Sequence, residues 1–454
     1  MNLDLSSDAT NAYAKQISTE SLGDHSYIVV VGDEAVAIDI QRDLDRFEDV
    51  LSDVDASLVA VFETHIHNDY VSGGKRLADI HGAEYVLPAN TGAPYDHTPL
   101  ADGATIDIGG WTMQAMHTPG HTHNHTSYVL VAPSGPVAIF SGGSMLVGAV
   151  GRSDLLGPDH TEMLLKDQYA SVHRIADELP DPSLVAPTHG SGSFCSASAI
   201  ADSTSTVDRE KLQNPALVAP SVEAFSMSQM MGYAPYPAYY RHMAPSNLEP
   251  MGAPPTGDLA RITTPDELRD ATIVDVRPFS EYAAGHIPGS LSFEMSNDDA
   301  VYMGWTLDWG SPLAIVGTGA DAQEVRMHLH RIGWDNVVGR IDPADLRSFS
   351  AGQLSETEIV TFADLGVEIG QGSLDVRDSV EQSTGVLPGA DLAHLSVVAA
   401  DPERFASHEP LLIYCGSGYR SGIAAGFIER AGGVPVVVKD SPGNYKGSLS
   451  VPAV

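Results

Sequence analysis

Short apolar runs, most of which end in a polar, histidine-rich or glycine-rich turn, dominate the first half of the chain. Runs of this length are typical of buried β-strands. Residues 27–32 and 35–40, separated by two acidic residues, predict a hairpin. Further strands are predicted at residues 58–63, 112–117, 127–131, 137–140 and 184–187. Because open α/β sheets place their chemistry at strand ends, the polar turns are the first candidates for a functional site.

The second half of the chain repeats itself. Asp275-Val-Arg277, followed by Ile287-Pro-Gly289, recurs as Asp375-Val-Arg377, followed by Leu387-Pro-Gly389. Each copy continues from an apolar strand through the Pro-Gly turn to a second strand and a helix, an alternation that predicts a parallel α/β sheet. The predicted elements are strands 273–276 and 313–316 with helix 322–332, and strands 374–376 and 411–414 with helix 422–431.

The length of the chain indicates several domains. It has 454 residues, and at roughly 100–200 residues per domain this predicts two to four domains. Residues 235–255 are rich in Pro, Tyr and Met, and their Pro density predicts a connector without a helix. We therefore expect three domains: residues 1–250, which end in this connector, residues 251–350 and residues 351–454.

The composition narrows the possible partners, because 60 Asp and Glu residues oppose 24 Lys and Arg residues for a formal net charge of −36. No segment gathers enough cations to neutralise a run of phosphates, which excludes nucleic acid and anionic membranes. Residues 1–17 have no signal-peptide pattern, and the apolar runs are too short to span a membrane. Two cysteines, Cys195 and Cys415, are too few for a disulfide framework. We expect a soluble cytoplasmic protein, and leave open whether it forms a homo-oligomer.

Histidines gather in the turns that follow three of the predicted strands. His65 and His67 alternate in the segment Thr64-His-Ile-His-Asn-Asp-Tyr70, which places both on one side of an extended chain. His121 follows a Pro-Gly turn, and His189 follows the strand at 184–187. Imidazole is a common ligand of Zn(II) and Fe(II), so these turns predict a metal site.

Together, the three histidine elements resemble the metallo-β-lactamase superfamily, whose pattern is THxHxDH, then TPGHT, then a Gly-Asp and a late His. The resemblance covers about half of the chain and implies an αββα fold. Tyr70 stands where the superfamily usually has a His, and Gly143 stands where it has a metal-binding Asp. Asp69 and His189 alone remain of the second metal position, so the resemblance implies a mononuclear site.

The ligands that survive are sufficient for one Fe(II) or Zn(II): His65, His67 and His121. In the persulfide dioxygenases of the superfamily, the iron ligands correspond to His65, His121 and the position of Gly143, so the carboxylate is absent here. Asp154 or His160 from the following loop is a candidate replacement, although Asp154 also fits a turn or cap. We expect an Asp introduced at position 143 to raise metal affinity. The alternative is a relict site whose histidines bond only to one another.

The two cysteines have different settings. Cys195, six residues after His189, is interpreted as a buried and inert thiol. Cys415 opens a Gly-rich loop before the predicted helix, where backbone N–H groups, the helix dipole and Arg420 favour a thiolate. The other residues of this loop are Gly416, Ser417, Gly418, Tyr419 and Ser421. The histidines interpreted as surface or structural residues are His25, His97, His123 and His125.

With Asp375-Val-Arg377, the Cys415 loop resembles that of the rhodanese sulfurtransferases, whose Cys carries sulfane sulfur as a persulfide. The resemblance implies catalytic roles for Cys415 and Arg420, with the guanidinium holding anionic donors. Val386 replaces the His that usually precedes Leu-Pro-Gly, and a Cys-x4-Arg loop also suits a phosphatase-like phosphate cradle. The first repeat matches the family at residues 285–289 but has no Cys in its loop, so we interpret it as a scaffold or spacer.

The order of the domains resembles fusions of a persulfide dioxygenase with a sulfurtransferase. It implies an enzyme of sulfur metabolism that acts on the persulfide of a low-molecular-weight thiol, with O₂ at the metal and sulfur transfer at Cys415. Two alternatives stay open. One is a glyoxalase-like thioester hydrolase, which the departures at Tyr70 and Gly143 disfavour. The other is a metal-silent N-terminal domain that serves a rhodanese.

Overall fold

The computed structural model describes residues 1–6, 11–196, 202–249, 252–365 and 372–451. The chain forms two compact units. Among the described residues, no helix is long and apolar enough to cross a membrane. The N-terminal unit comprises Met1–Tyr233, Tyr239–Pro254 and Arg331–Gly333, and the C-terminal unit comprises Ala234–Ala238, Pro255–His330 and Trp334–Val454.

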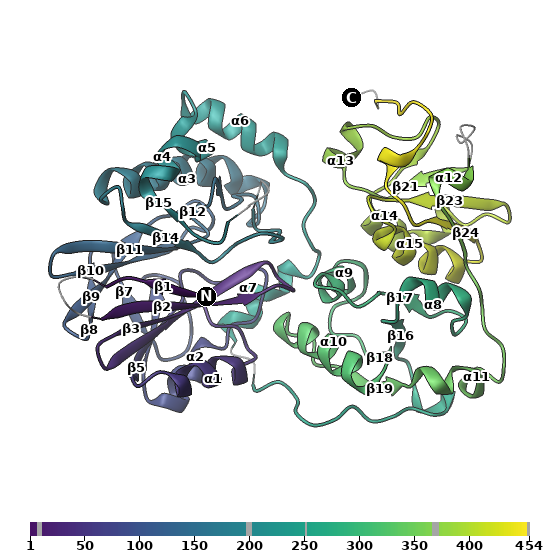
Figure 1. The fold of residues 1–454 in the computed structure, drawn as a ribbon, viewed down its shortest axis with the longest axis horizontal. Coiled ribbons are helices and arrows are strands. Elements are labelled where there is room, and N and C mark those ends of the chain that lie inside the picture. The colour runs from purple at the N-terminus through teal and green to yellow at the C-terminus, as the bar shows by residue number, and fades with distance from the viewer. Residues whose placement is uncertain (7–10, 197–201, 250–251, 366–371, 452–454) are drawn as a thin grey trace. The chain divides into compact units, whose positions relative to one another are not determined.

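Two β-sheets form the middle of the N-terminal unit (Figure 1). In the first sheet, the order is β1-β2-β3-β4-β5-β6-β7, and its strands are β1 (Asn2–Asp4), β2 (Ala12–Thr19), β3 (Asp24–Val31), β4 (Glu34–Ile38), β5 (Ser57–Phe62), β6 (Glu84–Pro88) and β7 (Thr98–Leu100). In the second, the order is β15-β14-β11-β10-β9-β8, and its strands are β8 (Thr105–Ile108), β9 (Trp111–His117), β10 (Thr126–Ala132), β11 (Gly135–Gly142), β14 (Leu184–Pro187) and β15 (Ser205–Thr206). A short hairpin pairs β12 (Met145–Leu146) with β13 (Ala149–Val150).

Helices cover the outer face of each sheet, so the layers run helix, sheet, sheet, helix (Figure 1). Phe47 and Leu77 anchor two helices on the first sheet, and Val172 and Phe225 anchor helices on the second. A third core, which includes Phe62 and the neighbouring inward-facing strand residues, joins the two sheets. The predicted αββα fold is confirmed. The covering helices are α1 (Asp45–Asp53), α2 (Gly74–His81), α3 (Pro158–Glu178), α4 (Val207–Gln213), α5 (Pro215–Val218) and α6 (Val222–Gly232).

The prediction that residues 235–255 contain no helix is wrong. Helix α7 (Tyr240–Leu248) forms there and includes Pro245. Proline in a helix interior costs about 3 kcal/mol because its N–H is missing and its ring crowds the preceding turn. Pro245 lies on the exposed side, whereas Tyr240, Met243 and Asn247 are buried. Burial of the face that carries these three side chains outweighs the cost of the proline. The high proportion of Pro in this segment of the sequence does not indicate such a face.

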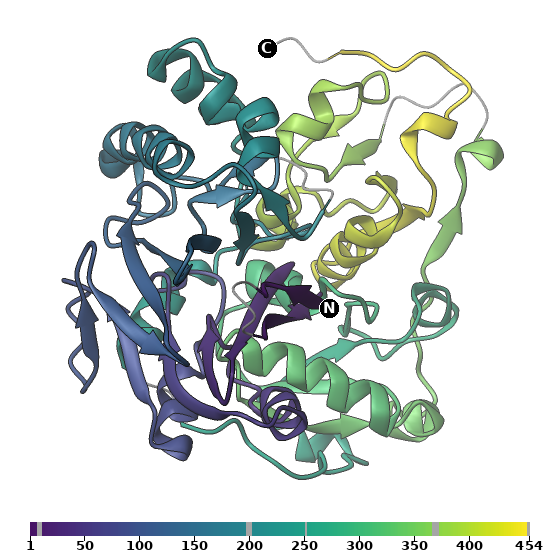
Figure 2. The ribbon, with the colours of Figure 1, turned by 60° about the vertical axis from the view of Figure 1, so that its left-hand side comes forward.

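In the C-terminal unit, the first repeat forms a parallel sheet in the order β17-β16-β18-β19 (Figure 1; Figure 2). Its strands are β16 (Thr272–Asp275), β17 (Leu291–Ser292), β18 (Leu313–Val316) and β19 (Val337–Ile341). Its helices are η1 (Pro265–Glu267), α8 (Phe279–Ala284), α9 (Asp299–Thr306), α10 (Gly319–Arg331), η2 (Pro343–Asp345) and α11 (Leu346–Phe349).

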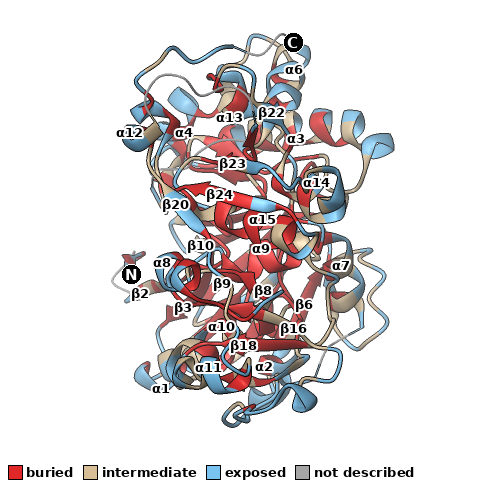
Figure 3. Ribbon diagram, turned by 90° about the vertical axis from the view of Figure 1, so that its right-hand side faces the viewer, coloured by how far each residue is buried: buried red, intermediate tan, exposed pale blue. Residues whose placement is uncertain are grey.

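The second repeat has the matching order β22-β21-β23-β24 and adds β20 beside β24. Figure 3 shows the central strands of the unit as largely buried, with exposed residues on outer helices such as α12. The strands of the second repeat are β20 (Glu358–Val360), β21 (Ser373–Asp375), β22 (Asp391–Leu392), β23 (Pro410–Tyr414) and β24 (Val434–Val438). Its helices are α12 (Phe362–Leu365), α13 (Ser379–Ser383), α14 (Leu395–Ala400), η3 (Pro402–Arg404), α15 (Tyr419–Arg430) and η4 (Pro442–Asn444).

A buried ion pair explains the Asp-Val-Arg motif. In the first repeat, Arg277 donates to both carboxylate oxygens of Asp275 and to the Gly285 carbonyl, with Nη2 to Asp275 Oδ2 at 2.6 Å. In the second, Arg377 donates in the same way to Asp375, again at 2.6 Å, and to the Gly385 carbonyl. Each motif therefore ties the end of a strand to the segment before the Pro-Gly turn.

Replacing Asp275 by Asn should lower the free energy of unfolding by about 3–5 kcal/mol, because it leaves the buried Arg277 guanidinium without its counter-charge. Urea denaturation of the intact chain measures the change. Asp345→Asn is the control, since Asp345 pairs with the exposed Arg261 and such pairs add little stability. Equal, small effects of the two substitutions would contradict the structural role of the motif.

Candidate functional site

The predicted site histidines meet where strand ends of the two N-terminal sheets come together. His65 and His67 follow β5, His121 follows β9 and His189 follows β14. All four side chains are at most 1% exposed. The ring centre of His65 lies 4.1 Å from that of His67 and 4.8 Å from that of His121, and the rings of His121 and His189 are 5.2 Å apart.

All four rings hold one nitrogen in hydrogen bonds and leave the other nitrogen unpartnered within the described structure. The inner Nε2 atoms of His65, His121 and His189 are buried and have no partner among the described residues. One ligand atom from each of the three residues lies within 4.8 Å of the others. The Nδ1 atoms are held by Thr64 Oγ1 at 2.9 Å, the Arg152 carbonyl at 2.8 Å and Asp24 Oδ1 at 2.8 Å, respectively.

This arrangement fits a metal ion. Buried polar atoms without partners are costly, so their convergence indicates a missing common partner. Metal-binding imidazoles typically donate their second nitrogen to a carboxylate or carbonyl, as His189 and His121 can here. Burial, reinforced by neighbouring imidazoles, lowers the pKa of His65, His121 and His189, so the rings are neutral and their lone pairs are available. Three imidazoles suit Zn(II) or Fe(II).

His67 differs from the other three. Its Nε2 lies 3.2 Å from Asp39 and 3.1 Å from Glu63, and the Tyr70 hydroxyl lies 2.9 Å from the same atom. Burial disfavours the charged ring, but the two carboxylates outweigh it and raise the pKa of His67 to about 10. Nδ1 of His67 lacks a partner within the described structure. The geometry therefore brings His189 into the group of converging donors and gives Tyr70 a supporting position behind His67.

The space beside Gly143 is already filled. A Cβ atom built on Gly143 would collide with the His121 ring, and one on Gly151 would collide with the Gly143 carbonyl and approach His121 Nδ1. The Gly143 N–H donates to His125 Nε2 at 2.9 Å, which gives His125 its structural role. The structure opposes the expectation that an Asp at position 143 raises metal affinity, because the His121 ring occupies the volume that its side chain needs.

The residues considered as substitutes for the missing carboxylate are engaged elsewhere. Both carboxylate oxygens of Asp154 accept hydrogen bonds from Arg152, each at 2.7 Å. Nδ1 of His160 lies 3.0 Å from Nε2 of His123 on an exposed part of the unit. In the described part of the chain, neither Asp154 nor His160 belongs to a group of converging donors. Asp154 thus takes the alternative role of a local pairing residue.

Asp69 and Cys195 form a second group of neighbouring donors with His189. One donor atom from each of Asp69, His189 and Cys195 lies within 4.8 Å of the others. Asp69 Oδ2 is 3.4 Å from His189 Nδ1, and burial raises the pKa of Asp69 to about 7. Cys195 is fully buried, its sulfur lies 3.8 Å from the Tyr240 hydroxyl, and burial raises its thiol pKa. These properties fit the predicted inert thiol.

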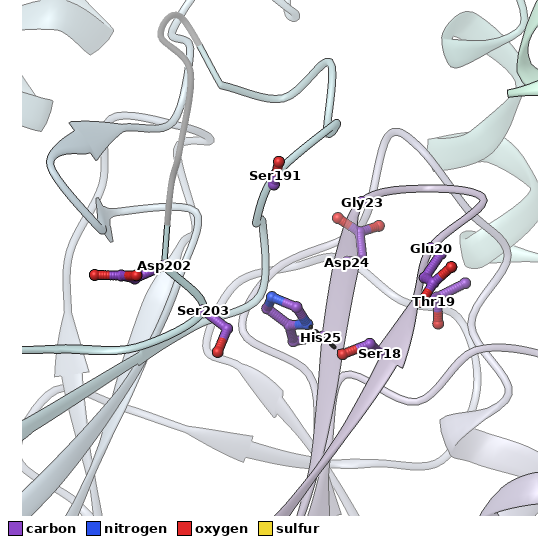
Figure 4. A pocket seen from close by; sticks show the side chains of 9 residues that line it. All are labelled: Ser18, Thr19, Glu20, Gly23, Asp24, His25, Ser191, Asp202 and Ser203. Carbon is purple, nitrogen blue, oxygen red and sulfur yellow. Dashed lines mark hydrogen bonds between the residues drawn. The ribbon is translucent and has the colours of Figure 1, made fainter. Parts of the chain in front are cut away.

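Asp24, which the sequence analysis missed, connects the site to a cavity. Burial raises its pKa to about 7, and its carboxylate holds His189. Asp24 and His25 line a cavity of about 210 Å³, and Figure 4 shows their side chains among those around it. Nδ1 of His25 lies 3.2 Å from Ser18 Oγ. An acidic residue that opens a strand with a continuous apolar second half was the available signal. Asp24 therefore lines the cavity and also orients the His189 ring.

The Cys415 loop leads from β23 into α15. Gly418 caps this helix with a φ of 101°, a conformation that favours glycine. The Gly418 N–H donates to Cys415 Sγ at 3.2 Å, and Ser421 Oγ lies 3.7 Å from the sulfur, which is fully buried. Arg420 lies beside the loop, but both ends of its guanidinium fork donate to Glu381. Glu381 therefore occupies the position in which an anionic donor was expected.

Comparison with known proteins agrees with both folds. Residues 261–341 match the family model of the rhodanese-like domain. A metallo-β-lactamase of Staphylococcus aureus has a crystal structure that superposes with a TM-score of 0.67 at 26% identity, covering 73% of this chain and 99% of that one. The chain therefore combines an N-terminal metallo-β-lactamase fold with a rhodanese-like domain. The predicted resemblance to the two families is confirmed.

Two of the curated relatives match half of the chain or less. Human mitochondrial persulfide dioxygenase ETHE1 is 28% identical over 217 residues, which are 47% of this chain and 78% of the relative. Hydroxyacylglutathione hydrolase of Pseudomonas putida is 37% identical over 92 residues, or 20% of this chain. The chain spans only 35% of the length of that hydrolase. Both types of enzyme considered from the sequence are thus represented among its relatives.

Replacing His189 by Ala should weaken metal binding as severely as replacing His121, because either change leaves two of the converging imidazoles, which make a poor site. Elemental analysis after equilibration with Fe(II) or Zn(II) and dialysis measures the bound metal. His123→Ala is the control, since His123 pairs with His160 away from the group and should keep its metal. A larger loss in His67→Ala than in His189→Ala would restore the ligand set predicted from the sequence.

Gly143→Asp should lower both metal affinity and stability, because the new side chain displaces the His121 ring. Overpacking of this kind costs about 1–3 kcal/mol. Thermal unfolding and metal titration measure the two effects. Gly319→Ala serves as a control, because a Cβ atom there meets only ordinary contacts. Tighter metal binding by Gly143→Asp would mean that His121 moves aside easily and that the site tolerates a carboxylate.

Proposed function

We propose that this protein is an enzyme of sulfur metabolism that couples a persulfide-oxidising metal centre to sulfur transfer at Cys415. The observation that carries the proposal is the convergence of the free Nε2 atoms of His65, His121 and His189. The similarity to persulfide dioxygenase ETHE1 over 217 residues and the match of residues 261–341 to the rhodanese-like domain both support sulfur chemistry. The substrate would be the persulfide of a low-molecular-weight thiol.

The metal centre would hold one Fe(II) or Zn(II) through His65, His121 and His189, with His67 as the remaining candidate ligand. When bound, Fe(II) would supply redox chemistry toward O₂ and sulfur, whereas Zn(II) would act only as a Lewis acid. The residues of the chain then orient the three rings through their Nδ1 atoms and exclude water from a buried site. No nucleic acid or membrane is part of the proposal, and the cytoplasm is its expected location.

The C-terminal unit would move sulfane sulfur. We assign residues 251–350 and 351–454 to two rhodanese-like domains, of which only the second has a cysteine in its loop. The Cys415 thiolate attacks the outer sulfur of a donor persulfide, so that a new S–S bond forms at Cys415 while the donor S–S bond breaks. The electron pair of that bond and one proton leave with the donor thiol. The Gly418 N–H lies 3.2 Å from the reacting sulfur and can stabilise its charge.

A thioester hydrolase is the second candidate, favoured by the match to hydroxyacylglutathione hydrolase. That activity in two-metal enzymes depends on a carboxylate that bridges the ions. Here the corresponding position is Gly143, and the His121 ring fills the neighbouring space. The proposal therefore ranks hydrolysis below oxidation. The third candidate, a metal-silent N-terminal domain, does not explain why the Nε2 atoms of three buried histidines lack partners and lie close together.

Protein loaded anaerobically with Fe(II) should consume one O₂ for each glutathione persulfide and release glutathione and sulfite, while a thioester substrate such as lactoylglutathione is hydrolysed near the background rate. Oxygen-electrode traces and sulfite assays measure the first reaction, and thiol release measures the second. His123→Ala is the matched control for His121→Ala, which should lose O₂ uptake. Efficient thioester cleavage by the Zn(II) form, without O₂ uptake by the Fe(II) form, would put the hydrolase first.

Cys415→Ser should abolish sulfur transfer and leave metal content and O₂ uptake unchanged, because the cysteine loop belongs to the other unit. After treatment with a persulfide donor, intact-mass and peptide analysis should find one added sulfur atom on Cys415. Cys195→Ser is the control and should retain the adduct. An adduct on Cys195 instead, or on neither cysteine, would refute the sulfurtransferase assignment.

A further inference from the structure

The guanidinium of Arg420 is already occupied. Nη2 donates to Glu381 Oε1 at 2.7 Å and Nη1 donates to Oε2, which makes a two-pronged ion pair. Arg420 is 16% exposed and Glu381 35%, so the pair is shielded from most of the solvent. Burial opposes ionisation of Glu381, but Arg420 outweighs it and lowers the Glu381 pKa to about 2. Paired forks of this type are among the strongest hydrogen-bonded contacts in proteins.

The second cation beside the loop is also matched by a carboxylate. The Lys439 backbone and side chain pack against Gly418, where an added Cβ would meet both. The Lys439 ammonium lies 3.3 Å from Glu294. Two further acids lie near the Arg420–Glu381 ion pair. Asp378 Oδ1 accepts the Glu381 N–H at 2.8 Å, and the charge of Arg420 acts on the Asp298 carboxyl. The charges around Cys415 are therefore balanced or negative.

Aromatic side chains from the repeat that has no cysteine pack beside the Cys415 loop. Helix α9 lies beside α14 (Figure 1). Its Tyr302 ring is 5.4 Å from Tyr419 in the Cys415 loop, and its Trp305 ring is 4.9 Å from His394. Burial and the nearby Arg420 lower the pKa of His394 to about 4, so this imidazole is neutral. The first repeat thus contributes uncharged aromatic rings to the surroundings of the Cys415 loop. It therefore does more than space the domains apart.

From these contacts, we infer that Glu381 sets the donor specificity of Cys415 by neutralising Arg420, so that the loop takes sulfane sulfur from thiol persulfides and discriminates against thiosulfate. The inference rests on the sulfur-transfer step of the proposed function. Thiosulfate would have to form the Cys415 S–S bond while its own S–S bond breaks and the electron pair leaves with sulfite. The leaving group carries two negative charges, which need a free cation. A thiol persulfide releases only a thiol, which needs no such cation.

The test compares kcat/KM for thiosulfate and for glutathione persulfide in the full chain. The unmodified protein should prefer the persulfide. Glu381→Gln should raise kcat/KM for thiosulfate by about tenfold or more, the equivalent of one charge-assisted hydrogen bond, with a much smaller change for the persulfide. Asp364→Asn is the matched control, since it removes one exposed negative charge of the same repeat without a contact to Arg420 and should leave the donor ratio unchanged.

A second variant guards against a loop that is merely damaged. Adding Arg420→Gln to Glu381→Gln should abolish the gain with thiosulfate, because the freed guanidinium is its cause. Mass analysis of the persulfide adduct on Cys415 confirms that the loop of each variant still accepts sulfur. An unchanged donor ratio in Glu381→Gln that carries the adduct, or a preference of the unmodified protein for thiosulfate, would overturn the inference. Absence of an adduct from either donor in the unmodified protein would instead refute the sulfur-transfer step itself.

Discussion

The buried carboxylate of Asp39 is the contact on which the N-terminal site depends. It accepts the Thr64 N–H at 2.7 Å, the Thr64 hydroxyl at 2.8 Å and the Thr188 hydroxyl, and it lies 3.2 Å from His67 Nε2. Each threonine directly precedes a site histidine, and the two threonines follow strands of different sheets. Burial opposes ionisation of Asp39, but His67 and these hydrogen bonds outweigh it and lower its pKa. One charged group thus ties together the two turns that carry His65, His67 and His189.

The lost carboxylate at position 143 has not left a hole. The His121 ring fills the space, and the glycine N–H is held by His125. The result is a site built from imidazoles, which retains strong metal donors while losing the group that would bridge two ions. The same compensation operates in the C-terminal unit, where Glu381 and Glu294 neutralise the cations beside the Cys415 loop.

The sequence predicted the layers and the internal repeat because apolar runs and turn residues report local structure. The strand predicted at residues 58–63 corresponds to β5 (Ser57–Phe62), and the histidine turns that follow the strands carry the candidate ligands. The sequence could not predict which nitrogen of each histidine ring faces the candidate metal site. That depends on partners distant in sequence, such as Asp24, which holds His189 from 165 residues away. Helix α7 was not predicted because the proline-rich composition of its segment argues against a helix, although one of its faces is buried. The contact of position 143 with the His121 ring depends on the folded chain and could not be predicted from the sequence.

Elemental analysis of protein purified without added metal tests the central claim, that the three imidazoles form a mononuclear metal centre. The measurement requires no substrate and no assumption about the reaction. We expect about one equivalent of iron or zinc per chain, since three neutral imidazoles bind one such ion and the group that would bridge a second is absent. Protein that binds no metal even after iron or zinc is supplied, or that holds two tightly bound ions per chain, would contradict it.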